Sequence, residues 1–208
     1  FTYKGKFFQF DDPVTVLPRP VQKPHPPIYV ACCSKPTMEM AARHGFNAIF
    51  APFAAAMMFG SVERAAAFHR ELAAEAGHPN VRTMCSYFVA VVDSRAEALK
   101  AKERLITYLR GVVPALPADR AKAPPHIAYF VEIVERLLSM KPEDLGERSI
   151  ITGSPEECIA SLKKVEAAGI EEVILYFNFG AYPHRDTMTM MDRFIRDVAP
   201  HFDGGATA

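Results

Sequence analysis

The sequence predicts an α/β protein built on a parallel β-sheet, and two observations support this class. Short, almost wholly apolar runs alternate with longer segments of helical periodicity, and such runs are typical of strands buried on both faces. The strand–helix order repeats four times, with a helical insertion before the last strand. Four such units form either a small open sheet or half of a (β/α)₈ barrel, because a complete barrel needs about 250 residues and this chain has 208.

Residues 1–27 are predicted to lie outside the core. They hold six prolines, which exclude a helix or a central strand. Residues 2–10, with Gly5 in the middle, are expected to form a small surface hairpin. The remainder is expected to be an extended approach to the first core strand.

The core is predicted to span residues 28–202. Helix starts are marked by proline or by capping boxes (Ser94 with Glu97, Ser154 with Glu157), and helix ends by glycine. Strands are expected at 28–33, 47–50, 84–92 and 172–179, and helices at 36–44, 61–76, 94–111, 126–140, 154–169 and 185–198. The stretch 112–125 is predicted to be a mobile loop and 203–208 a disordered tail.

Composition excludes several classes of protein. Lys plus Arg and Asp plus Glu each number 24, so the net charge of zero lacks the electrostatic signature of a nucleic-acid binder or of a protein bound to anionic membranes. No apolar run reaches the length of a membrane span, and the N-terminus does not read as a signal peptide. Four cysteines without framework spacing predict reduced thiols in the cytoplasm. The absence of an initial Met predicts a truncated chain.

The turn from Cys33 to Thr37 is the most informative candidate site. Ligands of parallel α/β proteins bind at the carboxyl ends of the strands, and this turn leads from a strand directly into a helix. Ser34 and Thr37 place two hydroxyls at the positive end of that helix, with Lys35 beside them. The residues alone allow two interpretations, a phosphate cradle or ordinary helix capping by Ser34.

Other candidates are weaker. Cys32 and Cys33 are either a vicinal redox pair or, as we favour, two buried small hydrophobic residues that face opposite ways. His184, after the last strand, is either a binding residue or a solvated residue at a helix start. The histidines show no metal-ligand spacing, and nucleotide-binding and nucleophile-elbow motifs are absent from the sequence.

Several segments resemble the bacterial luciferase-like flavin monooxygenases. They begin with Gly-Lys-Phe-Phe-Gln-Phe-Asp-Asp from Gly5, and the Pro-rich approach and the following helix up to Gly45 continue the resemblance. The carboxyl-terminal part agrees in the family's order. The matching segments are 5–12, 17–30, 37–45, 153–159, 168–170, 173–180, 183–184 and 198–202.

The resemblance implies a fold and a cofactor site. The family fold is a (β/α)₈ TIM barrel, and this chain resembles its second half, strands 5–8. In the family the loop after the fifth strand binds the FMN phosphate, which makes Ser34 and Thr37 phosphate contacts. Ala31, Cys32 and Cys33 would then line the flavin from the strand end. The loop after Gly111 resembles the family's mobile lid, and residues 178–184 would face the substrate.

The resemblance also implies an activity. Reduced FMN, supplied through NAD(P)H by a reductase, would activate O₂ to oxidise a small organic substrate such as an aldehyde or alkane. Two alternatives remain: an F420-dependent oxidoreductase of the same superfamily, and a non-catalytic flavin-binding fragment. We name no catalytic residue, because the family's catalytic His comes from the first half of the barrel. A half barrel has unpaired outer strands, so we expect a complementary half or self-association.

Overall fold

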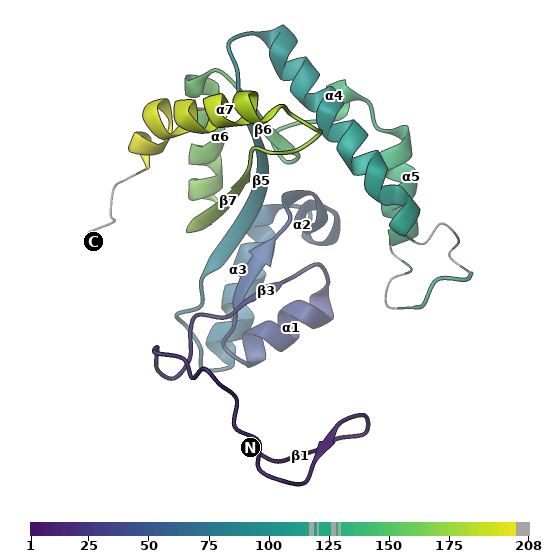
Figure 1. Ribbon diagram of the computed structural model, residues 1–208, viewed down its shortest axis with the longest axis vertical. Helices are drawn as coiled ribbons and strands as arrows, with labels where there is room; N and C mark the ends of the chain where they lie inside the picture. The colour runs from purple at the N-terminus through teal and green to yellow at the C-terminus, as the bar shows by residue number, and fades with distance from the viewer. Residues whose placement is uncertain (117–118, 120, 126–127, 129, 203–208) are drawn as a thin grey trace.

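The computed structural model describes residues 1–116, 119, 121–125, 128 and 130–202, and the predicted tail 203–208 lies outside them. A five-stranded parallel sheet forms the centre of the molecule, with helices packed along it (Figure 1). A two-stranded hairpin, β1 (Tyr3–Lys4) and β2 (Gln9–Phe10), precedes the sheet and projects away from it at the N-terminal end.

The sheet contains the four predicted strands and one more. The predicted strands are β3 (Tyr29–Ala31), β4 (Asn47–Phe50), β5 (Thr83–Val91) and β7 (Glu172–Tyr176). The additional strand is β6 (Ile150–Gly153), so the count of four was wrong. Its four residues run directly into the Ser154 capping box, and so short a run carries no periodicity of its own.

The long strand β5 organises the sheet. It pairs with both β4 and β7 through Met84 and Cys85, so these two partners occupy opposite edges of β5. Strand β6 pairs with β5 further along, at residues 88–91, and shares Phe88 with β7. Strand β6 therefore extends the β4 side of β5, and β3–β4–β5–β7 run side by side at the other end.

Helices follow most of the predicted boundaries. The helices are α1 (Lys35–Arg43), α3 (Val62–Glu75), α4 (Arg95–Val112), α5 (Phe130–Ser139), α6 (Pro155–Ala167) and α7 (His184–Asp197). Three 3₁₀ turns also occur among the described residues, at Val113–Ala115, Pro142–Asp144 and Ala199–His201. The first of them directly continues α4, so the predicted loop 112–125 begins later than expected.

Helix α2 (Pro52–Phe59) was not predicted, since no element was expected between the strand 47–50 and the helix 61–76. Its residues are nearly all apolar, so the segment shows no amphipathic stripe. The helix begins with Pro52 and ends at Gly60, whose left-handed φ of 85° closes it. These end signals were present, and only the periodicity was lacking.

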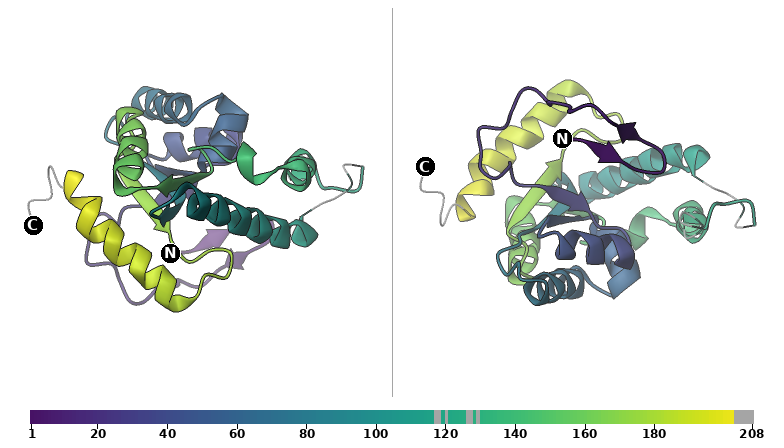
Figure 2. Two further views of the ribbon diagram at one scale, coloured as in Figure 1. Left: turned by 90° about the horizontal axis from the view of Figure 1, so that it is seen from above. Right: turned by 90° about the horizontal axis from the view of Figure 1, so that it is seen from below.

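One face of the sheet is covered by helices. Along the paired strands, the side chains on this face include Ala48, Phe50, Cys85 and Tyr87, all of which are buried. They belong to the main hydrophobic core, which also contains residues from α1, α3 and α6. Figure 2 shows these three helices grouped along one side of the strands.

Within the part of the chain that the structure describes, the opposite face, here called the open face, is uncovered along β3, β4, β7 and β5 up to Phe88, whereas further along β5 Ala90 is fully buried. By register and alternation it carries Tyr29, Ala31, Asn47, Ile49, Met84, Ser86, Phe88, Glu172, Ile174 and Tyr176. Every one of these residues is half-buried or exposed, including Ile174 at 36% and Tyr176 at 48%. An apolar sheet face left uncovered in this way is the main structural anomaly of the fold.

The described strands do not close into a barrel. Strand β3 pairs only with β4, and β7 only with β5, so both lie at sheet edges within the described residues. The α/β class and the parallel sheet are confirmed. The expectation that the chain is half of a barrel concerns its relation to a larger assembly, and it is taken up below as a proposal.

Candidate functional site

The turn between β3 and α1 is built around the Ser34 side chain. Ser34 is the N-cap of α1, in extended conformation, and Pro36 occupies the first turn. The Thr37 amide donates to Ser34 Oγ at 3.4 Å, and the hydroxyls of Ser34 and Thr37 lie 2.9 Å apart. Both side chains are half-exposed and Lys35 is exposed. The turn therefore presents two adjacent hydroxyls and the amide of Lys35 to solvent at the positive end of a helix.

The three residues before this turn face different ways. Ala31, the last residue of β3, is exposed on the open face. Cys32 is 1% exposed within the core, and its amide donates to Ile49 O at 2.9 Å. Cys33 is half-buried. Burial raises the pKa of Cys32 to about 12 and also raises the pKa of Cys33, so neither sulfur is held as a reactive thiolate.

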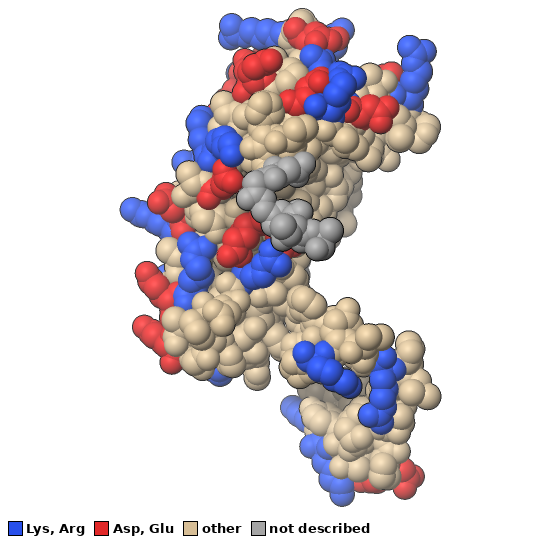
Figure 3. All heavy atoms as spheres, turned by 90° about the vertical axis from the view of Figure 1, so that its left-hand side faces the viewer, with Lys and Arg blue, Asp and Glu red and all other residues tan. Residues whose placement is uncertain are grey.

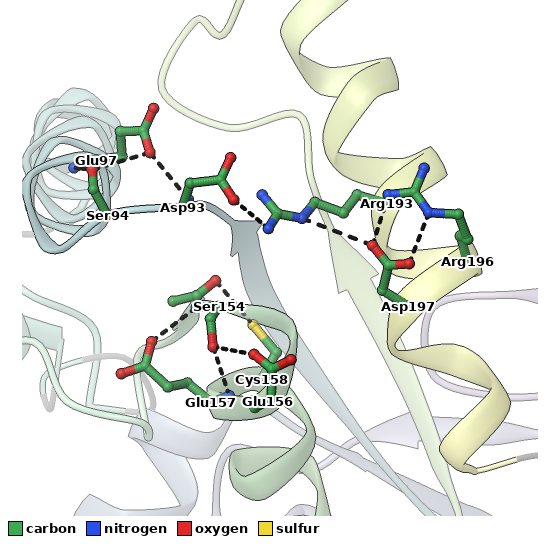
Figure 4. A network of polar contacts seen from close by, with 11 residues as sticks. Asp93, Ser94, Glu97, Ser154, Glu156, Glu157, Cys158, Arg193, Arg196 and Asp197 are labelled. Carbon is green, nitrogen blue, oxygen red and sulfur yellow. Dashed lines mark hydrogen bonds and ion pairs between the residues drawn. The ribbon is translucent and has the colours of Figure 1, made fainter.

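The carboxyl ends of β5 and β6 carry a polar network (Figure 4). Ser154 and Glu157 form the predicted capping box of α6, with the Ser154 amide donating to Glu157 at 2.8 Å. Ser94 caps α4 by accepting from the Glu97 amide, and the Glu97 carboxylate accepts from the Asp93 amide and from the Ser94 hydroxyl. Both helix starts are thus already neutralised by their own glutamates.

Arg193 joins this network to α7. Its guanidinium pairs with Asp93 at the end of β5 and lies 3.9 Å from Asp197 one turn along α7. Asp197 also pairs with Arg196 at 2.7 Å, and this bond is the main cause that lowers the pKa of Asp197. A cavity of about 320 Å³ lies beside the two helix starts, lined among others by Lys102. Because its carboxylates and arginine are mutually paired, we interpret this network as structural.

The segment after β7 is held in place by α4. Arg104 donates to the carbonyl oxygens of Gly180 (2.9 Å) and Ala181 (3.1 Å), and its guanidinium stacks over the Tyr182 ring. Gly180 has a φ of 60°, and a Cβ atom there would lie 2.6 Å from the Arg104 carbonyl oxygen. His184, the other candidate in this region, is exposed at the first position of α7.

Charge on the open face is confined to the amino end of the strands. The Tyr29 hydroxyl donates to Glu172 Oε1 at 2.6 Å, and this hydrogen bond joins β3 to β7. The Arg82 guanidinium pairs with the same carboxylate at 2.7 Å, and the backbone amide of Arg82 donates to Asn47 Oδ1. Burial and the Glu172 contact raise the pKa of Tyr29, so it stays a neutral donor.

Global features add little to the choice of site. Basic and acidic side chains are interspersed over the body of the face drawn in Figure 3. No described helix is long and apolar enough to cross a membrane. Among the described residues, no group of three or more His, Cys, Asp or Glu is arranged to hold a metal ion.

Comparison with known proteins defines the class. The profile of the luciferase-like monooxygenase family matches residues 1–172, and the chain therefore belongs to this family. The resemblance that the sequence motifs indicated is confirmed. A curated relative, the oxygenase component of a flavin-dependent trigonelline monooxygenase from Acinetobacter baylyi, is 23% identical over 221 residues, covering 97% of this chain and 55% of the relative.

Solved structures show the same fold. The monooxygenase RslO1 from Streptomyces bottropensis superposes with a TM-score of 0.72 at 22% identity, covering 97% of this chain and 56% of RslO1. An F420-dependent secondary alcohol dehydrogenase superposes with a TM-score of 0.65 at 18% sequence identity, covering 97% of this chain and 55% of the dehydrogenase. The oxygenating constituent of 3,6-diketocamphane monooxygenase from Pseudomonas putida superposes with a TM-score of 0.61 at 17% sequence identity, covering 97% of this chain and 58% of that protein. The chain thus spans about half the length of each of these proteins.

The structure leaves the predicted site residues distributed in two groups. Ala31, Ser34 and Thr37 are accessible at the carboxyl end of β3, whereas the Cys32 side chain points into the core. Tyr176, Phe88 and Tyr108 were not among the predicted site residues, although their rings lie close together in the structure. Knowledge of strand register would have been required to find them, because they lie far apart in the sequence.

Proposed function

We propose that this chain is the carboxyl-terminal half of the barrel of an FMN-dependent monooxygenase. The observation that carries the proposal is the open face with the Ser34–Thr37 turn at its carboxyl edge. A barrel interior is lined by side chains from all of its strands, so half of its strands would leave such an apolar face uncovered. The relatives, of which this chain spans about half, support the same interpretation.

The turn fits the phosphate of a flavin nucleotide. Two hydroxyls 2.9 Å apart and a first-turn amide can all donate to phosphate oxygens, and Lys35 adds positive charge. The mutual hydrogen bond of Ser34 and Thr37 is then exchanged for bonds to the anion. Ala31, Cys33 and the backbone of Cys32 would support the flavin at the end of β3.

The residues of this chain would act by binding and by exclusion of water. Bound FMN, once reduced, supplies the chemistry of O₂ activation. Ser34 and Thr37 hold the cofactor at the strand ends, and the apolar open face keeps water away from the reacting region. The catalytic acid or base is expected from the other half of the barrel. The reductant is expected to arrive through a reductase, because the curated relative is an oxygenase component.

The complementary half is the partner that this proposal requires. Uncovered edge strands and an apolar face favour association. The chain on its own is therefore expected to self-associate or to bind the first half of the barrel. A sharply melting monomer in sedimentation and calorimetry would contradict the half-barrel proposal.

Titration of the chain with FMN, F420 and riboflavin tests the cofactor assignment. We expect the fluorescence of FMN to be quenched when it binds. Riboflavin, which lacks the phosphate, is expected to bind at least tenfold more weakly than FMN. Tighter binding of F420 than of FMN would favour the alternative oxidoreductase, which the F420-dependent structural neighbour keeps open. Equal affinity for FMN and riboflavin would refute the phosphate site.

Activity is tested with NADH, a flavin reductase and FMN present together. Substrate-dependent oxygen uptake by the chain joined to its complementary half would support a monooxygenase. Flavin binding without oxygen uptake in that assembly would identify a non-catalytic flavin-binding protein instead.

A further inference from the structure

Three aromatic rings form a continuous cluster at the carboxyl end of the open face. Phe88 of β5 lies beside Tyr176 of β7, with ring centroids 5.6 Å apart. Tyr108 of α4 meets Phe88 edge-on at 5.7 Å. These three residues are called the aromatic platform below. They come from three separate elements, so only the folded chain brings them together.

The aromatic platform is accessible. Tyr176 is 48% exposed and Tyr108 45% exposed, and Phe88 is half-buried between them. Tyr176 is the last residue of β7, which places the platform at the same end of the sheet as the Ser34–Thr37 turn. Exposed aromatic rings at the ligand-binding end of a parallel sheet call for a functional explanation.

The platform is rigidly supported from behind. Phe179 is 2% exposed and packs edge-on against Phe88 at 5.3 Å. Tyr182 packs on Phe179 in turn, and Arg104 of α4 fixes this segment through two carbonyl oxygens and the Tyr182 ring. A ring held in this way loses little conformational entropy when a ligand stacks on it.

The charge distribution specifies the ligand. The open-face residues Ser86 and Ile174, which pair with each other two residues before Phe88 and Tyr176, are uncharged, as are Ala31, Ile49 and Met84 elsewhere on this face. The charged groups of this face, Glu172 and Arg82, are paired with each other at the amino end. Ring faces and edges favour other rings over saturated chains, and an uncharged surface favours an uncharged ligand.

We propose that the aromatic platform binds the flat, uncharged aromatic ring of the substrate. This inference rests on the proposed function and narrows it from small organic molecules in general to planar aromatic ones. The flavin ring is the other source of the same chemistry, and the two are separated by competition.

Binding of 2-naphthol and of its saturated analogue decahydro-2-naphthol, measured by equilibrium dialysis, tests the inference. Both molecules are neutral and carry one hydroxyl, and only the first is flat and aromatic. We expect 2-naphthol to bind at least about 5-fold more tightly, in keeping with aromatic pairing. Equal affinities would overturn the proposal.

Tyr176→Leu provides the matched test, because it removes the ring and keeps an apolar side chain. We expect 2-naphthol affinity to fall about 3- to 10-fold, with decahydro-2-naphthol unchanged. Tyr3→Leu, at a 53% exposed tyrosine in the hairpin, is the control and should alter neither. If Tyr176→Leu does not fold, Tyr108→Leu on the α4 surface replaces it. An unchanged affinity in the folded variant would refute the proposal.

Saturation with FMN separates the two sources of the ring. Retained 2-naphthol binding supports a substrate site, whereas displacement would overturn that assignment and give the platform to the flavin ring. Loss of 2-naphthol selectivity with FMN binding intact refutes only this inference. Failure of FMN to bind to the chain joined to its complementary half refutes the proposed function.

Discussion

Removal of the Ser34 hydroxyl has two separable consequences. As the N-cap of α1, Ser34 accepts from the Thr37 amide at 3.4 Å, a long bond whose loss should cost about 0.5–1 kcal/mol of stability. As a donor to a phosphate, the same hydroxyl should contribute about 1.5–3 kcal/mol to binding. Ser34→Ala is therefore expected to weaken FMN binding by about 10- to 150-fold while only slightly lowering the free energy of unfolding.

Two further variants separate capping from binding. Thr37→Val removes a hydroxyl and preserves the amide that Ser34 caps, so FMN affinity should fall with little change in stability. Ser61→Ala is the matched control: Ser61 caps α3 by accepting from the Arg64 amide at 3.1 Å, and its loss should lower stability alone.

Flavin fluorescence measures FMN and riboflavin affinities of the variants, and urea titration measures their stabilities. We expect Ser34→Ala to lose affinity for FMN and to keep its affinity for riboflavin, because riboflavin has no phosphate for the hydroxyl to contact. If Ser34→Ala lowered both affinities equally, or neither, the turn would be an ordinary helix cap and the phosphate site would be wrong.

Three other predictions concern stability and are measured by urea unfolding. Gly180→Ala should destabilise by at least about 1–2 kcal/mol, because φ is 60° and the new Cβ would meet the Arg104 carbonyl oxygen, whereas Gly111→Ala in α4 meets nothing within 4 Å and should stabilise by about 0.5–1 kcal/mol. Burial lowers the pKa of His69 below 6.5, so the native state binds fewer protons than the unfolded chain and stability should fall as pH drops below about 6.5; His69→Gln should flatten this profile. Leu105→Ala, at a fully buried position, should cost about 2–5 kcal/mol, and a smaller loss would contradict tight packing beneath α4.

Local signals were sufficient to predict most of the elements. Strand 47–50 is observed with the predicted bounds, because Gly45 precedes it and Pro52 follows it. Helix α2 and strand β6 were missed for opposite reasons, the first being uniformly apolar and the second too short. In both cases the tertiary contacts of the segment, and not its own periodicity, decide its conformation.

The candidate site was only partly predictable from the sequence. The Ser34–Thr37 turn lies within four residues, so its hydroxyls could be identified directly, and the structure confirms that they are adjacent. The aromatic platform depends on the pairing of Phe88 with Tyr176, which are far apart in the chain. Which face of the sheet stays open likewise depends on where the helices pack, and no local pattern encodes that.

The contact between Tyr29 and Glu172 constrains the shape of the sheet. Strands β3 and β7 are separated by three strand spacings, about 14 Å across a flat sheet. Their side chains nevertheless meet at 2.6 Å on the open face, which requires them to converge across the two intervening strands. Convergence on that face, opposite to α1, α3 and α6, is the direction of curvature of a barrel wall. Because paired charges fill the amino end of this concave face, the uncharged carboxyl end is the part left for a ligand.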